Sequence, residues 1–167
     1  METVLRVRRA FFGGAIGLAI MLTSAGAICA TSSQSPVVQA KARAEVRGII
    51  NRIAALPPGQ DSAQDQQELF DQLVAMGPQA VPSIVDLMDD CRRLPVAALS
   101  LENKSPNAFE SRRHYGPALM VDALSAVLNQ LTGASFGSVY NSAYDQVSEA
   151  DRRAVVSSWR AYSRGER

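Results

Sequence analysis

The chain has 167 residues and a formal net charge of +1, with 17 basic and 16 acidic side chains. This near-neutral balance, without a long basic run, excludes nucleic acid as a partner, because such binding depends on neutralising phosphates. The length beyond residue 30 is enough for one domain with a single hydrophobic core, whereas two domains would be crowded.

The first 30 residues have the layout of a secretory signal peptide. An uncharged run of 21 residues, 10–30, follows directly on three arginines: Arg6, Arg8 and Arg9. Small residues near the end of the run suit signal peptidase, and cleavage after Ala30 is favoured over cleavage after Ala27. The sequence therefore predicts an exported protein that is periplasmic or secreted.

Two alternatives would leave the protein attached to the membrane. A run of this length can span a bilayer, since about 20 apolar residues cross the hydrocarbon core, although its four glycines weaken it as a permanent helix. Cys29 suggests a lipoprotein, but Ile28 stands where a small residue is required. An uncleaved leader would give an inner-membrane anchor with the body outside the cytoplasm, because the arginines stay inside.

Cys91 is the only cysteine outside the leader. Cleavage would therefore exclude an intramolecular disulfide. The adjacent Arg92 and Arg93 favour a reactive thiolate, whereas most lone cysteines are small buried apolar residues, and we expect Cys91 to be buried.

Helical spacing of apolar residues follows a short polar linker over residues 31–36. It predicts three helices in the first half of the chain: residues 37–56, from Asp61 or Ser62 to 76, and from 78 to about 90. Pro57-Pro58-Gly59 and Gly77-Pro78 separate them, as expected of residues that interrupt helices.

The central segment, residues 91–115, loses the helical pattern, and connections of that length are often functional. Two further helices are predicted, over residues 119–131 and 148–163, the second opening with a capping box of Ser148 and Asp151. The first carries the clearest apolar stripe, with Asp122, Ser125 and Asn129 on the opposite face. Residues 96–101 could be extended, but no strand is convincing, so the predicted fold class is all-α, with about five helices and a long central loop.

Five of the chain's ten aromatic residues lie in its last 32 residues. They are Phe136, Tyr140, Tyr144, Trp159 and Tyr162. We expect them to bury the irregular residues 134–147 against the terminal helix rather than to form an exposed protein or glycan surface.

A possible repeat is marked by Gly77-Pro78 and Gly116-Pro117, which are 39 residues apart and each precede an apolar helix. A period near 40 suggests stacked helical hairpins. Residues 73–90 resemble the turn and second helix of a HEAT-type repeat. Residues 122–137, with the ending Trp159-Arg160-Ala161-Tyr162, resemble the close of uncharacterised, exported bacterial HEAT-like proteins.

The resemblance covers residues 62–163 and implies that residues 37–167 form a short right-handed HEAT-like array. It implies a scaffold or binding surface and supplies no catalytic residues. The chain has about two repeats where three or more are usual, so the helices at 37–56 and 148–163 would act as caps.

The densest group of functional side chains is Arg112, Arg113, His114 and Tyr115. At the start of the following helix, these residues would suit a small anion such as a carboxylate or phosphate. In the structural alternative the arginines pair with Glu110, Asp86 or Asp122, and Tyr115 covers the edge of the core. We predict no metal site or cofactor, because one histidine and so few cysteines give too few ligands.

These observations predict a non-enzymatic, exported protein-interaction or scaffold module of the cell envelope, with another envelope protein as partner. Contact with the membrane would be through the N-terminal segment alone, if it is uncleaved. The alternative function is binding of a small anionic ligand by the Arg112–Tyr115 cluster. An enzyme that uses Cys91 or His114 is the weakest interpretation, because nothing in their spacing brings them together.

The layout of the leader predicts export, which can be tested by fractionating the cells that produce the protein and sequencing its N-terminus. We expect a chain outside the cytoplasm that begins at residue 31. A membrane-bound chain beginning at Met1 would indicate the anchor, and a full-length soluble chain in the cytoplasm would contradict export.

Overall fold

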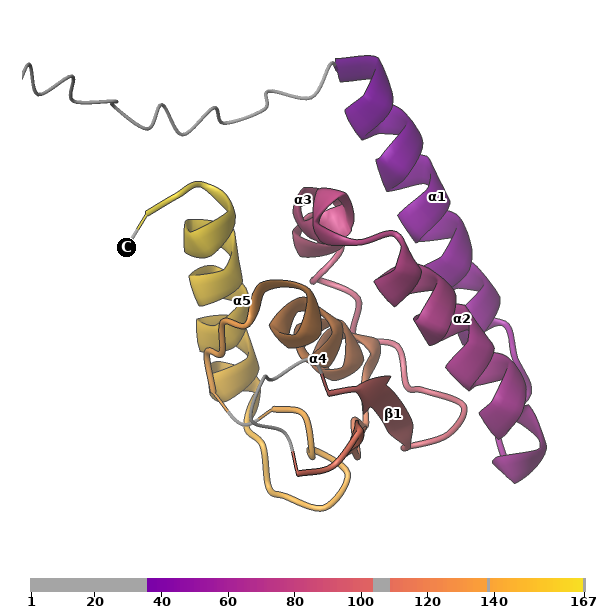
Figure 1. Cartoon of the computed structure of the whole chain (residues 1–167). Helices are drawn as coiled ribbons and strands as arrows, with labels where there is room; N and C mark the ends of the chain where they lie inside the picture. The colour runs from indigo at the N-terminus through magenta and orange to yellow at the C-terminus, as the bar shows by residue number, and fades with distance from the viewer. Residues whose placement is uncertain (1–35, 104–108, 138, 167) are drawn as a thin grey trace, which may run out of the picture. The chain divides into compact units, whose positions relative to one another are not determined.

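The computed structural model describes residues 36–103, 109–137 and 139–166 (Figure 1). The predicted leader and residues 31–35 of the expected linker lie outside these ranges, while Pro36 already belongs to the first helix. No helix in the described ranges is long and apolar enough to cross a membrane. The elements are α1 (Pro36–Ala54), η1 (Gln60–Ser62), α2 (Ala63–Ala75), η2 (Pro78–Ala80), α3 (Val81–Val85), β1 (Leu99–Glu102), β2 (Arg112–Tyr115), α4 (Met120–Thr132) and α5 (Glu149–Ser163).

The long helices lie close to where hydrophobic periodicity predicts them. The capping box of α5 is confirmed, since the Asp151 N–H donates to Ser148 Oγ and the Ser148 N–H donates to the Asp151 carboxylate, both at 3.1 Å. Gly133 follows α4 in the left-handed conformation, with φ 72°, which favours glycine and ends the helix.

The third predicted helix is wrong in length, because α3 ends at Val85 and not near residue 90. Residues 86–89 continue as turns, in which the Met88 N–H donates to the Val85 carbonyl at 3.3 Å. A longer helix would place Asp86, Asp89 and Asp90 in its last turns, where the helix dipole disfavours negative charge.

The central segment contains a small antiparallel sheet that the sequence pattern did not predict. Leu99 pairs with Tyr115 and Glu102 with Arg112. The alternation that identifies a half-buried strand is present in β1, where Leu99 and Leu101 are buried, but it extends over only four residues. The fold is therefore mostly helical, which agrees broadly with the predicted all-α class, and the described residues add one small two-stranded sheet.

Two neighbouring glutamines of α2, which we call the glutamine clamp, attach the central segment to the helices. The Gln66 amide donates to the Val96 and Ala98 carbonyls at 2.9 Å and accepts from the Val96 N–H at 3.0 Å. The Gln67 amide donates to the Ser100 carbonyl at 2.6 Å and accepts from the Ser100 N–H at 2.9 Å. The clamp thus satisfies backbone groups that β2 does not reach.

Each α-helix packs against at least one of its neighbours in the chain and against the next helix but one (Figure 1). α1 packs against α2 and α3, α2 against α4, and α5 against α3 and α4. Two layers result, one of α1, α3 and α5 and one of α2 and α4. Helix α4 is in the middle, and every residue from Met120 to Leu128 is buried.

The polar side of α4 is buried, contrary to the amphipathic pattern. Asp122 and Ser125 are completely inaccessible, because α5 covers the face that the sequence pattern places opposite the core. Trp159 of α5 donates its indole N–H to Ser125 Oγ at 2.9 Å. A helix that is buried on all sides needs this kind of partner for each polar group.

Aromatic side chains hold the segment after α4 against α5, as expected. The Phe136 ring lies edge-on to the Trp159 ring, with centroids 4.7 Å apart, and Tyr162 contacts both rings. Trp159 is completely buried, whereas Tyr144 is largely exposed. Burial against the terminal helix is therefore confirmed for Phe136 and Trp159 and does not extend to Tyr144.

Leu124→Ala tests the central position of α4. Leu124 is completely buried, so we expect its truncation to lower the free energy of unfolding by about 2–5 kcal/mol through lost burial and a residual cavity. Leu131→Ala, at the partly buried end of the same helix, is the control and should cost clearly less. Urea denaturation of both variants measures the difference, and equal costs would contradict the central position of Leu124 in the core.

Candidate functional site

The structure places Arg112, Arg113, His114 and Tyr115 on β2, ahead of α4 and not at its first turn. The first amides of α4 already have partners. The Met120 N–H donates to the Arg92 carbonyl at 2.8 Å, and the Val121 N–H donates to the Asp90 carbonyl at 2.9 Å. The helix start therefore offers these donors to the protein's own backbone rather than to an anion.

The four side chains do not converge. Arg112 donates to Ser100 Oγ at 2.8 Å and forms a 3.8 Å ion pair with Asp71. The Tyr115 hydroxyl accepts from Gln130 at 3.3 Å, and its ring lies edge-on to Tyr140. Arg113 and His114 are exposed and, as neighbours on a strand, point to opposite faces.

Two of the three acidic partners named in the structural alternative, Asp86 and Asp122, are engaged elsewhere. Asp86 forms a 3.6 Å ion pair with Arg43, and Asp122 pairs with Arg152. The partner of Arg112 is Asp71, on α2. Tyr115 does pack against the core, as that alternative expected.

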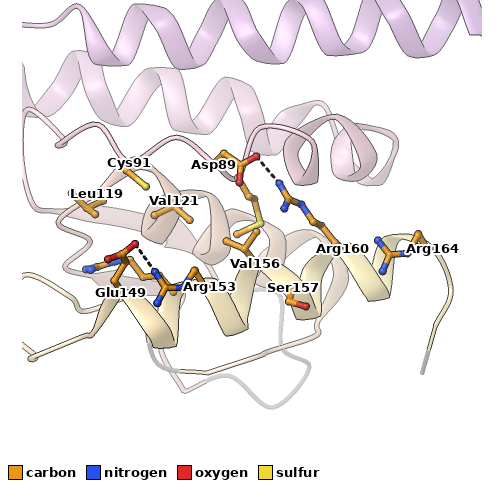
Figure 2. Close-up of a pocket in the computed structure, with 12 residues that line it drawn as sticks. Asp89, Cys91, Leu119, Val121, Glu149, Arg153, Val156, Ser157, Arg160 and Arg164 are labelled. Atoms are coloured by element: carbon orange, nitrogen blue, oxygen red, sulfur yellow. Dashed lines mark hydrogen bonds and ion pairs between the residues drawn. The ribbon is translucent and has the colours of Figure 1, made fainter.

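A concave surface lined by four arginines lies elsewhere, along α5, and we call it the α5 groove (Figure 2). It has a volume of about 690 Å³ and separates α5 from residues 88–91 and the start of α4. Apolar side chains and arginines dominate its lining: Met88, Asp89, Cys91, Leu119, Val121, Glu149, Arg152, Arg153, Val156, Ser157, Arg160 and Arg164. A hollow of this size is within the range of ligand sites.

The rim of the groove carries arginines in solvent-exposed ion pairs. Arg160 reaches from α5 to Asp89 on the opposite wall at 2.6 Å, and Arg153 pairs with Glu149 at 2.5 Å (Figure 2). Beyond them Arg164 pairs with Glu166 at 2.5 Å. Exposed pairs of this kind contribute little to folding, so these arginines are free to exchange partners.

Behind the rim lies a buried ionic network centred on Asp122. Arg152 Nε donates to Asp122 Oδ1 at 2.8 Å, and Arg152 Nη2 donates to Oδ2 at 3.2 Å. The Ser142 hydroxyl and the Leu119 N–H also donate to this carboxylate. Asp122 is completely buried and needs several donors, because a buried charge without them is costly.

The wall opposite α5 is shaped by Asp90. Burial opposes ionisation of this carboxyl, but hydrogen bonds from the side chain and backbone N–H of Arg92 outweigh that effect and lower the pKa of Asp90. Arg92 also donates to Asn51 Oδ1 of α1 at 3.1 Å. These contacts fix the turn in place. Its carbonyl groups accept the hydrogen bonds from the first N–H groups of α4.

Cys91 is exposed and lines the groove, so the expectation of a buried cysteine is wrong. The tight turn at Asp90 directs the thiol away from the core. His114, on β2, is not among the groove residues, so the lining does not combine a thiol with an imidazole base. In the ranges that the structure describes, no group of acidic, histidine and cysteine residues could hold a metal ion.

The arginines of the α5 groove were not identified from the sequence. Their spacing was a usable signal, because Arg153, Arg160 and Arg164 are seven and four residues apart and so share one face of a helix. The opposite wall had no comparable signal, since it depends on how residues 88–91 fold against α4.

No protein-family model matches this chain, and comparisons with curated proteins and with solved structures find no match. What the groove does is therefore inferred from its own geometry and chemistry.

Removing Asp122 tests the buried network. In Asp122→Ala the Arg152 guanidinium, 18% exposed, loses its acidic partner, and we expect a loss of about 3–5 kcal/mol in the free energy of unfolding. The control is Asp89→Ala, which breaks the exposed pair with Arg160 and should cost less than about 1 kcal/mol. Chemical denaturation of both variants gives their free energies of unfolding. Similar losses would show that the buried network contributes no more to stability than an exposed ion pair.

Proposed function

We propose that the protein is a non-enzymatic, exported interaction module of the cell envelope, built on a short HEAT-like helical array. The contacts of each helix with at least one neighbour and with its next but one support the repeat arrangement, because stacked hairpins pack in this way. The leader layout of residues 1–30 supports export.

The α5 groove carries the proposal. Its floor is apolar, with Val121 and Val156 at the base, and its rim is formed by charged groups already exposed to water. Protein interaction sites share this arrangement of an apolar centre and a polar rim. The groove is also formed by rigid elements, since α5 is fixed by the Asp122 network and the opposite wall by the Asp90 turn.

Binding of a small anion by Arg112 to Tyr115 has less support. Arg112 and Tyr115 are engaged with Ser100, Asp71 and Gln130, and Arg113 and His114 leave β2 in opposite directions. An anion site needs donors that converge on one point.

Site-specific crosslinking tests the function. We expect Ser157→benzoylphenylalanine, in the α5 groove, to form a defined adduct with a second protein on illumination of the producing cells. The control is Gln64→benzoylphenylalanine, at an exposed position of α2, which should not form that adduct. Gel mobility and mass spectrometry identify the product, and the absence of any protein adduct at Ser157 would contradict the proposal.

A further inference from the structure

We infer that the α5 groove binds an acidic amphipathic helix of the partner protein. The carboxylates of that helix would contact Arg153, Arg160 and Arg164, and its apolar side chains would cover the groove floor. This inference rests on the proposed interaction function and adds the chemistry of the partner.

The spacing of the arginines fits another helix. Arg153 and Arg160 lie on α5 and Arg164 is its C-cap residue, at intervals of seven and four residues, or about 10 and 6 Å along the axis. A second helix lying beside α5 and running in the same direction has the same rise per residue. Acidic residues at i, i+7 and i+11 of the partner would therefore lie opposite the three arginines, as acidic and basic residues do on the facing surfaces of paired helices.

The arginines can accept new carboxylates at little cost. Each is paired with an exposed acidic group of the protein itself: Glu149, Asp89 or Glu166. Replacing one exposed carboxylate by another leaves no buried charge unpaired. Arg152 differs, because its pairing with the buried Asp122 holds the fold together.

The groove floor supplies the apolar contact that helix recognition needs. Leu119 is partly exposed between the arginine rim and the opposite wall, Val156 lies beside it, and the buried side chains of Met88 and Val121 support them from the core. A volume of about 690 Å³ takes the side chains of one face of a helix and not a whole helix. This is the geometry in which an amphipathic helix lays its apolar face into a groove.

Fluorescence anisotropy with the full-length protein tests the inference. The probe is a fluorescein-labelled helical peptide with leucines on one face and glutamates at i, i+7 and i+11. The matched control peptide has glutamine at those three positions. We expect the glutamate peptide to bind about tenfold more tightly, the effect of three exposed ion pairs. Equal affinity for the two peptides, or no binding of the glutamate peptide, would overturn the inference.

Two double variants test which arginines are used. Arg153→Gln with Arg164→Gln should weaken binding of the glutamate peptide about fivefold. Arg47→Gln with Arg113→Gln removes the same charge from exposed positions on α1 and β2 and should leave affinity unchanged. Equal effects of the two double variants would indicate general charge attraction and overturn the assigned site.

Cys91 reports where the peptide binds, because its thiol lines the groove. In a Cys29→Ser background, the bound glutamate peptide should slow alkylation of Cys91 by iodoacetamide. Peptide binding without this protection would place the peptide elsewhere and overturn the inference.

The crosslinking experiment distinguishes failure of the acidic-helix inference from failure of the interaction function. Loss of the Ser157 adduct in the Arg153→Gln and Arg164→Gln background supports the acidic helix. Persistence of the adduct at full yield would overturn the acidic helix and leave the interaction function standing, whereas no adduct with the arginines intact contradicts the function itself.

Discussion

The arrangement around α4 depends on the need to satisfy one buried carboxylate. Asp122 has no access to water, and its donors come from three separate segments: Leu119 before α4, Ser142 in the following loop, and Arg152 on α5. A buried charge requires all of these contacts at once. The same interaction therefore caps α4, closes the loop over it and fixes the position of α5, which becomes one wall of the groove.

Local periodicity was sufficient to predict the long helices, because their apolar residues recur every three or four positions and their ends carry residues such as Gly133 and Ser148. It could not reveal that Asp122 and Ser125 are buried. Their place opposite the apolar stripe of α4 indicates a solvent-facing side unless another element covers it. The covering element is α5, which is remote in sequence, so the outcome depends on tertiary packing.

The site was harder to predict than the fold, for two physical reasons. Adjacent residues such as Arg113 and His114 look like a cluster in the sequence, but a strand turns neighbouring side chains to opposite faces. Arg153, Arg160 and Arg164 look dispersed, but a helix brings them into a row. In both cases the secondary structure decides which charges act together, and β2 was too short to recognise by its pattern.

The glutamine clamp limits how this sequence can diverge. Gln66 uses its amide both as a donor, to Val96 and Ala98, and as an acceptor, from Val96. Glutamate has no donor when ionised, and lysine has no acceptor. Asparagine has both groups but is one methylene shorter. Almost no other natural residue can therefore replace glutamine at position 66, although glutamine is common on protein surfaces. A glutamine at this position is a sensitive marker for relatives that share the fold.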